Sequence, residues 1–312
     1  MSNGNQSTLL DQAPAYVADV SYEYEGVLMP KFTPARCVEA VRNFTVRDDD
    51  IFLITYPKSG TTWVQQIALL ARHNGDESQV KYNIMKMVPF LEAVESMHLE
   101  SASTSRMQTE IADEKPSPRI LKTHVVPKWL PDSIRDSTRG KVIYVARNPK
   151  DMMVSYFHFC RTSCNLPKYQ SWNVFYEEFM ADRVPYGSWF ENVLYWWKKR
   201  EEPNVLFLQY EDMKKDLKGS IGQISEFMGK FFSEEKIDAI VAGSTFDAMK
   251  KNKTSNPDQV SKRKKGDGTS FMRKGAVGDW RNFFSNEQSE RFDKIYKEKL
   301  VGSGLRFTFE QE

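Results

Sequence analysis

The sequence predicts a single α/β domain with a mostly parallel central sheet flanked by helices. Two observations predict this class. First, four short apolar, partly β-branched runs recur between helical segments: Ile51–Thr55, Ile120–Thr123, Val142–Ala146 and Val205–Gln209. Runs of this length are typical of buried strands. Second, strands that alternate with helices along one chain imply a parallel sheet covered on both faces.

Helices are expected between and after these strands. The segments with helical character are Trp63–Arg72, Met152–Cys160, Trp172–Met180 and Trp189–Lys199. Ser285 and Gln288 have the spacing of a capping box, which predicts a last helix that ends near Leu300.

Changes in composition set the expected limits of the domain. Residues 1–20 begin with a polar stretch and predict a flexible N-terminal tail, which leaves residues 21–312 as the folded domain. Residues 250–270 are rich in Lys, Asn, Ser, Asp and Gly, and predict a long mobile loop. We find no internal repeat, and 312 residues can bury one large core, so a single domain is expected.

Charge and cysteine usage exclude several classes of protein. The 44 basic and 42 acidic residues leave a net charge of +2, so no general attraction to nucleic acid or membranes is expected. No segment approaches the roughly 20 apolar residues of a membrane span, and the N-terminus does not resemble a signal peptide. A cytoplasmic protein is therefore expected. Cys160, Cys164 and His158 are close in sequence, but no fourth ligand accompanies them and no metal is expected.

A phosphate-binding turn is predicted directly after the first strand, in the segment Tyr56–Trp63. A strand that turns into a helix presents free backbone N–H groups and the positive end of the helix dipole to an anion. Gly60 permits close approach of the backbone, and Lys58 adds a positive charge. The turn resembles a P-loop, but Lys58 precedes the turn and only one glycine is present. An ordinary strand–turn–helix junction is the alternative.

Lys122 and His124 end the second strand. Residues two apart in a strand face the same side, and parallel sheets bind ligands at the carboxyl ends of their strands. His124 is therefore a candidate general base, and Lys122 is a candidate for stabilising negative charge. A structural histidine at a strand end is the alternative.

Two further basic segments follow. Arg147 ends the third strand beside a helix that Asn148 and Pro149 are expected to begin, which predicts a second anion site with Ser155 as a further donor. A kinase would need an acidic residue here to hold magnesium. The segment Phe271–Gly275 adds the bidentate Arg273 and a glycine that permits close approach.

These segments together resemble the cytosolic sulfotransferase family over nearly the whole chain after about Tyr24. The motifs that carry the resemblance are Tyr-Pro-Lys-Ser-Gly-Thr-Thr-Trp, Leu-Lys-Thr-His, Val-Ala-Arg-Asn-Pro-Lys-Asp, Tyr-Glu-Asp-Met-Lys-Lys and Arg-Lys-Gly-Ala-Val-Gly-Asp-Trp, in this order.

The resemblance implies a nucleotide donor, 3′-phosphoadenosine-5′-phosphosulfate (PAPS), with 3′-phosphoadenosine-5′-phosphate (PAP) as product. It implies three groups of donor contacts. The 5′-phosphosulfate would contact Lys58, Ser59, Gly60, Thr61 and Thr62; the adenine pocket would comprise Trp63, Phe246, Tyr210, Ser244 and Met249; the 3′-phosphate would contact Arg147, Ser155, Arg273, Lys274 and Gly275, with Phe271 and Met272 alongside.

The resemblance also implies catalytic roles for His124 as general base and for Lys58 and Lys122 as charge stabilisers, without a metal. The acceptor would contact Lys122, Thr123, His124, Phe90, Phe157 and His158, and the lining is expected to include Val27, Met29, Phe32 and Val88 as well. Because most of these residues are apolar, a small hydrophobic phenol, alcohol or steroid is expected, with an amine as a further option. Residues 250–270 would form a lid.

The family's short dimer motif has the form Lys-x-x-x-Thr-Val-x-x-x-Glu, and the matching stretch here begins at Arg281. Asn286 stands where the motif has valine, which removes an apolar contact and puts a homodimer by this route in doubt. Two other functions stay open at this point: a nucleotide kinase, which would need magnesium, and a nucleotide-binding module without turnover.

Overall fold

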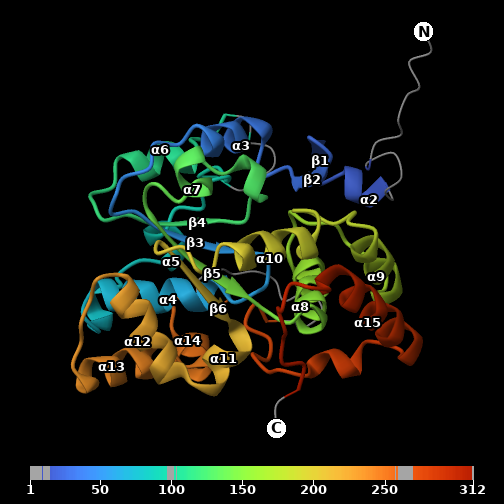
Figure 1. The fold of residues 1–312 in the computed structure, drawn as a ribbon. Coiled ribbons are helices and arrows are strands. Elements are labelled where there is room, and N and C mark those ends of the chain that lie inside the picture. The colour runs from blue at the N-terminus through green and yellow to red at the C-terminus, as the bar shows by residue number, and fades with distance from the viewer. Residues whose placement is uncertain are drawn as a thin grey trace.

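The computed structural model describes residue 9, residues 15–96, residue 102, residues 104–256, residue 258 and residues 270–310. Its central sheet has four parallel strands in the order β4-β3-β5-β6 (Figure 1). The strands are β3 (Ile51–Thr55), β4 (Ile120–Thr123), β5 (Lys141–Ala146) and β6 (Val205–Gln209). The four predicted strands and the α/β class are confirmed.

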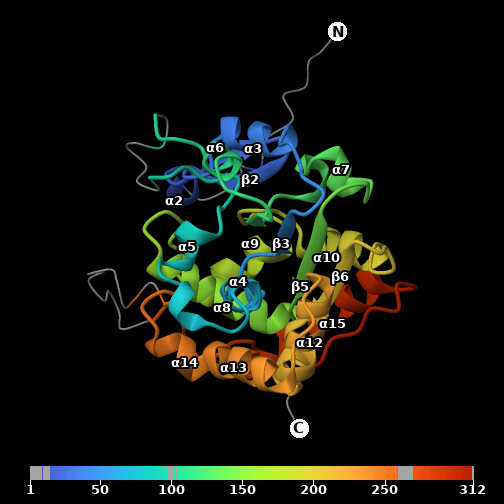
Figure 2. The same ribbon diagram turned by 90° about the vertical axis from the view of Figure 1, so that its left-hand side faces the viewer.

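Alternation along the strands gives the sheet two apolar faces. Phe52 and Ile54 of β3 point into one hydrophobic cluster, while Ile51 and Leu53 point into the other. The second face is covered by helices that lie together in Figures 1 and 2: α4 (Thr61–Arg72), α11 (Tyr210–Lys215), α12 (Leu217–Phe227) and α13 (Glu234–Ser244). The sheet is therefore the middle layer of the fold.

The first face carries the larger cluster. The helices that contribute to it are α3 (Ala35–Arg42), α8 (Pro149–Thr162), α9 (Trp172–Met180), α10 (Trp189–Lys198) and α15 (Asn286–Leu300). Shorter helices complete the fold: α2 (Ala15–Ala18), α5 (Ile84–Met87), α6 (Gln108–Asp113), α7 (Asp132–Arg135) and α14 (Phe246–Lys251), with 3-10 turns at Glu77–Gln79, Pro127–Trp129 and Asp279–Asn282. None of the helices within the described residues is both long and apolar enough to cross a membrane.

Local sequence signals explain where the helices at the sheet edge begin. The Asn148 side chain accepts a hydrogen bond from the Asp151 N–H at 2.9 Å, and Pro149 occupies the first turn, so α8 starts three residues earlier than expected. Gly60 has φ of +103°, and α4 begins at the next residue. The capping box of Ser285 and Gln288 opens α15 as predicted.

The N-terminal region differs from the expectation. An antiparallel hairpin of β1 (Ser21–Tyr24) and β2 (Val27–Pro30) was not predicted. Its two-residue turn, Glu25-Gly26, has positive φ at both positions, as tight hairpins require. The expected tail over residues 1–20 is also too long, because Val17 in α2 is fully buried in the core.

Most of the expected loop at 250–270 lies outside the described residues. Its first two residues belong to α14, and Ser255 and Asn256 are buried. Ser255 donates to the Met249 carbonyl, and the Asn256 side chain donates to the Lys250 carbonyl. The described beginning of this segment is therefore packed against α14.

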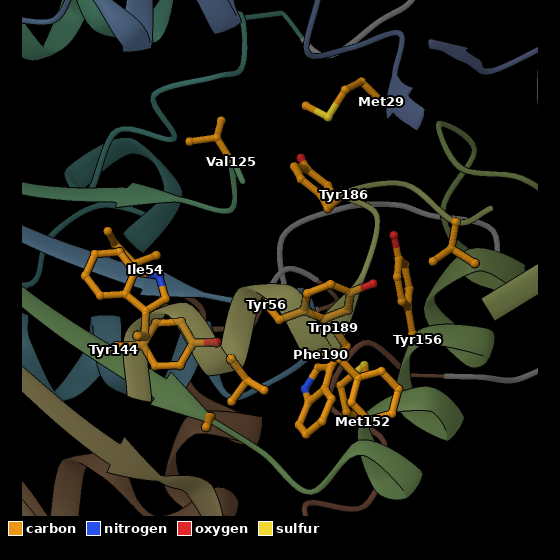
Figure 3. Packing of buried hydrophobic residues seen from close by; sticks show 14 of the residues in the cluster. Met29, Ile54, Tyr56, Val125, Tyr144, Met152, Tyr156, Tyr186, Trp189 and Phe190 are labelled. Atoms are coloured by element: carbon orange, nitrogen blue, oxygen red, sulfur yellow. The ribbon is translucent and has the colours of Figure 1, made fainter. Parts of the chain in front are cut away.

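Aromatic packing supports the turn that follows β3 (Figure 3). Tyr56 is fully buried, and its hydroxyl donates to the Gly187 carbonyl at 2.7 Å. Its ring meets that of Tyr156 edge-on at 6.3 Å, and the Tyr156 hydroxyl donates to the Pro185 carbonyl. The first residue of the predicted phosphate turn is thus fixed on the core of the domain.

Candidate active site

A cavity of about 280 Å³ lies beyond the carboxyl ends of β3, β4 and β5. It brings together most of the residues that the sequence predicted for donor and acid–base chemistry. The predicted residues that line it are Lys58, Gly60, Thr61, Thr62, Trp63, Phe90, Lys122, His124, Arg147, Ser155, Tyr210, Phe246, Met249, Phe271, Met272, Arg273, Lys274 and Gly275. Seven stretches that are separate in sequence therefore meet at one sheet edge.

The turn after β3 has the geometry of an anion cradle. Lys58 and Gly60 both have positive φ, +71° and +103°. A Cβ atom on Gly60 would lie 2.9 Å from the Tyr210 ring, so this position has room only for glycine. Ser59 is fully buried beneath the turn, and its hydroxyl has no hydrogen-bond partner in the described part of the chain.

Lys58 is a cation held between aromatic rings. Its Nζ lies 4.1 Å from the centre of the Phe159 ring and 4.7 Å from that of Phe271. Burial and, to a smaller extent, the nearby Arg147 guanidinium lower the pKa of Lys58 to about 7. An anion in the cradle would favour the charged form of this lysine.

Arg147 lies between the cradle and the C-terminal segment. It donates to the carbonyls of Lys58 and Ala276 at 3.2 and 3.3 Å, and its guanidinium lies 4.5 Å from the Tyr210 ring centre. Its Nε–H is buried and has no partner among the described residues. Because a buried donor without a partner is costly, this group points to a bound acceptor such as a phosphate oxygen.

Arg273 and Lys274 share one carboxylate. Both side chains form ion pairs with Asp279 at 2.5 Å. Although burial opposes it, hydrogen bonds from Lys274, Asn282 and Arg273 hold the pKa of Asp279 below its ordinary value. This carboxylate orients the two basic side chains on the wall of the cavity.

The aromatic part of the cavity is formed by Trp63, Tyr210 and Phe246. The Trp63 and Tyr210 rings meet edge-on at 5.2 Å, and Trp63 Nε1 donates to the Ser244 carbonyl at 2.8 Å. Ser244 itself does not line the cavity, because its hydroxyl is buried and donates to the Ile240 carbonyl. Its contact with Trp63 indicates that it orients the indole from behind.

His124 is fixed in one tautomer at the end of β4. Its Nδ1 lies 2.7 Å from the Thr55 carbonyl oxygen, which can only accept, so Nδ1 carries the proton and Nε2 carries the free lone pair. Burial lowers the pKa of His124 well below its ordinary value, and Lys122 adds to this. The imidazole is therefore neutral near pH 7, which is the form that a general base needs.

Lys122 lies on the same side of β4 as His124. Its Nζ is 3.7 Å from the centre of the Phe90 ring. Burial lowers the pKa of Lys122, while the Glu92 carboxylate opposes this shift. Sequence reasoning missed Glu92, which accepts hydrogen bonds from the Thr123 hydroxyl and the His124 N–H, both at 2.7 Å. Thr123 is buried behind the cavity and is not part of its lining.

The acceptor end of the cavity differs in part from the prediction. Phe32 and Phe90 line it as expected, together with Phe159, Leu166, Tyr186, Ile84 and Met85, which were not predicted. Val27, Met29, Val88, Phe157 and His158 lie outside the lining.

The positions of Phe157 and His158 have a simple helical reason. On α8, Phe159 is one turn beyond Ser155 and shares its face, whereas Phe157 points away from Ser155. The Phe157 ring packs against Trp172 and Phe175, and the His158 ring packs against Phe283. The spacing from Ser155 was the signal that would have identified Phe159.

The comparisons with known proteins decide the family. A model described as the sulfotransferase domain matches residues 48–304 of the chain. The chain belongs to the sulfotransferase family. It is 42% identical to sulfotransferase 1C2 of Rattus norvegicus over 272 residues, which cover 86% of this sulfotransferase and 89% of that protein. It is 38% identical to the amine sulfotransferase of Oryctolagus cuniculus, with 88% of each chain covered.

Solved structures agree in fold. The structure of retinol dehydratase in complex with androsterone and PAP superposes with a TM-score of 0.84 at 27% identity, covering 96% of this sulfotransferase and 94% of that chain. Mouse sulfotransferase SULT7A1 in complex with PAP gives a TM-score of 0.75 at 32% identity, with 91% and 96% covered. This chain is therefore a PAPS-dependent sulfotransferase, and the nucleotide-kinase alternative is wrong.

Proposed function

We propose that this sulfotransferase moves the sulfuryl group of PAPS to the hydroxyl of a small, uncharged, largely apolar acceptor, with His124 as general base. The observation that carries the proposal is the contact of His124 Nδ1 with the Thr55 carbonyl, since it leaves Nε2 as the free acceptor of a proton. Lys122 and Lys58 line the same cavity.

The donor half of the proposal rests on the cradle and the second anion site. The turn of Lys58 to Thr62 would receive the 5′-phosphosulfate, because its helix N-terminus and Lys58 favour negative charge. Arg147 and Arg273 would receive the 3′-phosphate, since Arg147 has a buried Nε–H without a described partner. The close approach that Gly60 and Gly275 permit fits a ligand lying against the backbone.

The proposed class of acceptor follows from the charge of the cavity as well as from its apolar lining. Among the described residues that line the cavity there is no aspartate or glutamate, whereas Lys58, Lys122 and Arg147 are present. A protonated amine would enter a cavity whose lining carries these positive charges and no carboxylate among the described residues, which disfavours it. Phe32, Phe90 and Tyr186 instead offer aromatic surface to a phenol or a fused-ring alcohol.

The residues then have distinct parts in the transfer. His124 Nε2 accepts the acceptor hydroxyl proton while the oxygen attacks sulfur, forming the new S–O bond. Lys58 stabilises the charge that develops on the phosphate oxygen as its bond to sulfur breaks. Lys122 stabilises the transferring sulfonate. Positioning and preorganised charge supply most of the rate enhancement in such a displacement.

The first test uses purified protein, labelled PAPS and a panel of phenols, aliphatic alcohols, sterols and amines, with EDTA present. We expect sulfated phenol or alcohol, and a loss of about 10²- to 10⁴-fold in turnover for His124→Ala. Binding of PAP to this variant should stay close to wild type. His73→Ala is the matched control, because His73 is the C-cap residue that follows α4 and does not line the cavity. Full turnover in His124→Ala would refute the assignment of the base.

Three expectations from the sequence stay predictions: a cytoplasmic location, turnover without a metal, and a lid formed by residues 250–270. The EDTA arm of the assay tests the second. The first two do not affect the assignment of His124.

A further inference from the structure

The segment before α6 extends the edge of the sheet beside His124. β4 is an edge strand, and the Pro89–Leu91 stretch pairs with it. The Leu91 N–H donates to the Lys122 carbonyl, and the Lys122 N–H donates to the Pro89 carbonyl, both at 2.9 Å. This pairing carries the next residue, Glu92, to the point where β4 ends.

The Glu92 carboxylate completes the hydrogen bonding of that strand end. One oxygen accepts from the His124 N–H and the other from the Thr123 hydroxyl, and the Thr123 oxygen accepts in turn from the Val125 N–H at 3.1 Å. Glu92 is fully buried. The backbone on both sides of His124 is therefore held by one carboxylate, while the imidazole is held separately by Thr55.

Burial of a carboxylate is costly unless charge or hydrogen bonds compensate for it. Burial raises the pKa of Glu92 to about 7 although Lys122, on β4, opposes this shift, so the carboxylate is ionised above about pH 7. The Glu92 charge in turn raises the pKa of Lys122 against the effect of burial. The Glu92 charge also raises the pKa of Cys37 on α3 and of Tyr186, and Lys58 lowers the pKa of His124.

We infer that Glu92 is a positioning residue of the transfer reaction: it fixes the backbone that carries His124 and supplies the negative charge that keeps Lys122 protonated. This inference rests on the proposed function, in which His124 is the base and Lys122 stabilises the sulfonate. Burial lowers the pKa of Lys122 and Glu92 raises it, so removal of the carboxylate should make Lys122 lose its proton at lower pH.

Glu92→Gln tests the charge because glutamine has the same shape. We expect kcat to fall about 10- to 100-fold, the scale on which outer partners of functional groups act. The alkaline limb of the kcat–pH profile should move to lower pH by about one unit, because Lys122 has lost its counter-charge. PAP affinity and the Tm should stay near those of wild type.

Two variants make this test specific. Glu178→Gln is the matched control, since Glu178 is a buried carboxylate paired with Arg183 and does not line the cavity. It should leave kcat and the pH profile unchanged. Glu92→Asp keeps the charge and shortens the reach, so it should lower kcat without moving the alkaline limb. Unchanged kcat and profile in Glu92→Gln would overturn the inference. A fall in PAP affinity and Tm that parallels the fall in kcat would also overturn it, because it would show that Glu92 only stabilises the fold.

A double-mutant cycle with Lys122→Gln tests the connection directly. If Glu92 acts through Lys122 as well as through His124, the losses of the two single variants should not add in the double variant. Additive losses would overturn the part of the inference that concerns Lys122.

Nitrogen NMR on histidine-labelled protein separates this inference from the proposed function. The chain has four histidines, so His124 can be assigned with the His124→Ala variant. We expect one tautomer, protonated at Nδ1, in wild type. Glu92→Ala removes the hydrogen bond that holds the His124 backbone, so the contact of Nδ1 with Thr55 should loosen and a mixture of tautomers should appear. This result together with no sulfated product from wild type would refute the proposed function and leave the positioning role standing. An unchanged His124 tautomer in Glu92→Ala would overturn the positioning of His124.

Discussion

At the scale of a single residue, Lys58 makes the binding of the donor nucleotide depend on pH. Its ammonium lies between two aromatic rings in a buried cradle, and its pKa in the free protein is lowered to about 7 by burial and by Arg147. A phosphate in the cradle would raise this pKa again, because an opposite charge favours the protonated form. Binding above pH 7 must therefore take up a proton.

This linkage predicts the pH dependence of PAP affinity. Below about pH 7 Lys58 is already protonated, so this group should not make PAP affinity depend on pH. Above that pH the affinity should fall by up to about tenfold per pH unit. Calorimetry at pH 8 in buffers of different ionisation enthalpy should show close to one proton taken up per PAP bound. Lys58→Met should abolish the uptake, and Lys236→Met, which changes an exposed lysine of α13, should retain it. Uptake that survives in Lys58→Met would assign the proton to another group.

At the scale of elements, the sequence predicted those parts of the fold that local patterns determine. The four strands were found because each is a short apolar run, and β3 is buried at every position. The starts of α4 and α8 were placed two to three residues late, because polar capping residues, not apolar periodicity, decide where a helix begins. The hairpin of β1 and β2 was missed because its turn signal, Glu25-Gly26, is weaker than an asparagine–glycine pair.

Local sequence patterns also decided which residues of the site could be predicted. Lys58, His124 and Arg147 were predicted because each follows a strand, and parallel strands bring their carboxyl ends to one edge. Glu92 was not predicted, because its segment pairs with β4 through backbone hydrogen bonds, and such pairing leaves no pattern of side chains in the sequence. Phe157 was assigned to the acceptor pocket without the helical phase that Ser155 already set.

Gly275, in the last basic segment, lies close to Phe246 of α14. This close approach allows a specific prediction. It has φ of +63°, and a Cβ atom there would lie 2.5 Å from the Phe246 ring. Gly275→Ala should therefore displace either the backbone or the ring, and weaken PAP binding by at least about tenfold. Calorimetric titration with PAP measures this loss.

Gly302→Ala separates backbone strain from the clash. Gly302 has φ of +73°, but nothing lies within 4 Å of the added Cβ. Gly302→Ala should lose about 1 kcal/mol of unfolding free energy in denaturant titrations, because an L-residue is strained at positive φ, and Gly275→Ala should lose at least as much. Only Gly275→Ala should also lose PAP affinity. Equal PAP binding by the two variants would mean that the contact with Phe246 has no part in the nucleotide site.

At the scale of the whole molecule, the cavity depends on the order of the strands. β3 and β5 are neighbours in the sheet, but they are far apart in the chain, because a long segment that includes β4 lies between them. The two helix N-termini that follow β3 and β5 are thereby brought side by side, and Arg147 bonds directly to the Lys58 carbonyl. A ligand with two separated anionic groups matches this arrangement, because one group would meet the cradle and the other would meet Arg147 and Arg273, which line the same cavity.

The quaternary state is the last prediction at this scale, and the stretch from Arg281 to Glu290 decides it. Arg281 forms an ion pair with Glu310, and Ser285 caps α15, so two positions of the family's dimer motif make contacts within their own chain. Asn286, in place of an apolar residue, is exposed. We expect a single species near 36.2 kDa in sedimentation velocity at micromolar concentration. Asn286→Val should shift the protein toward a dimer by restoring the apolar contact, while Asn286→Asp, the polar control, should not. A wild-type dimer that persists in Asn286→Asp would show that the subunits associate through a different surface.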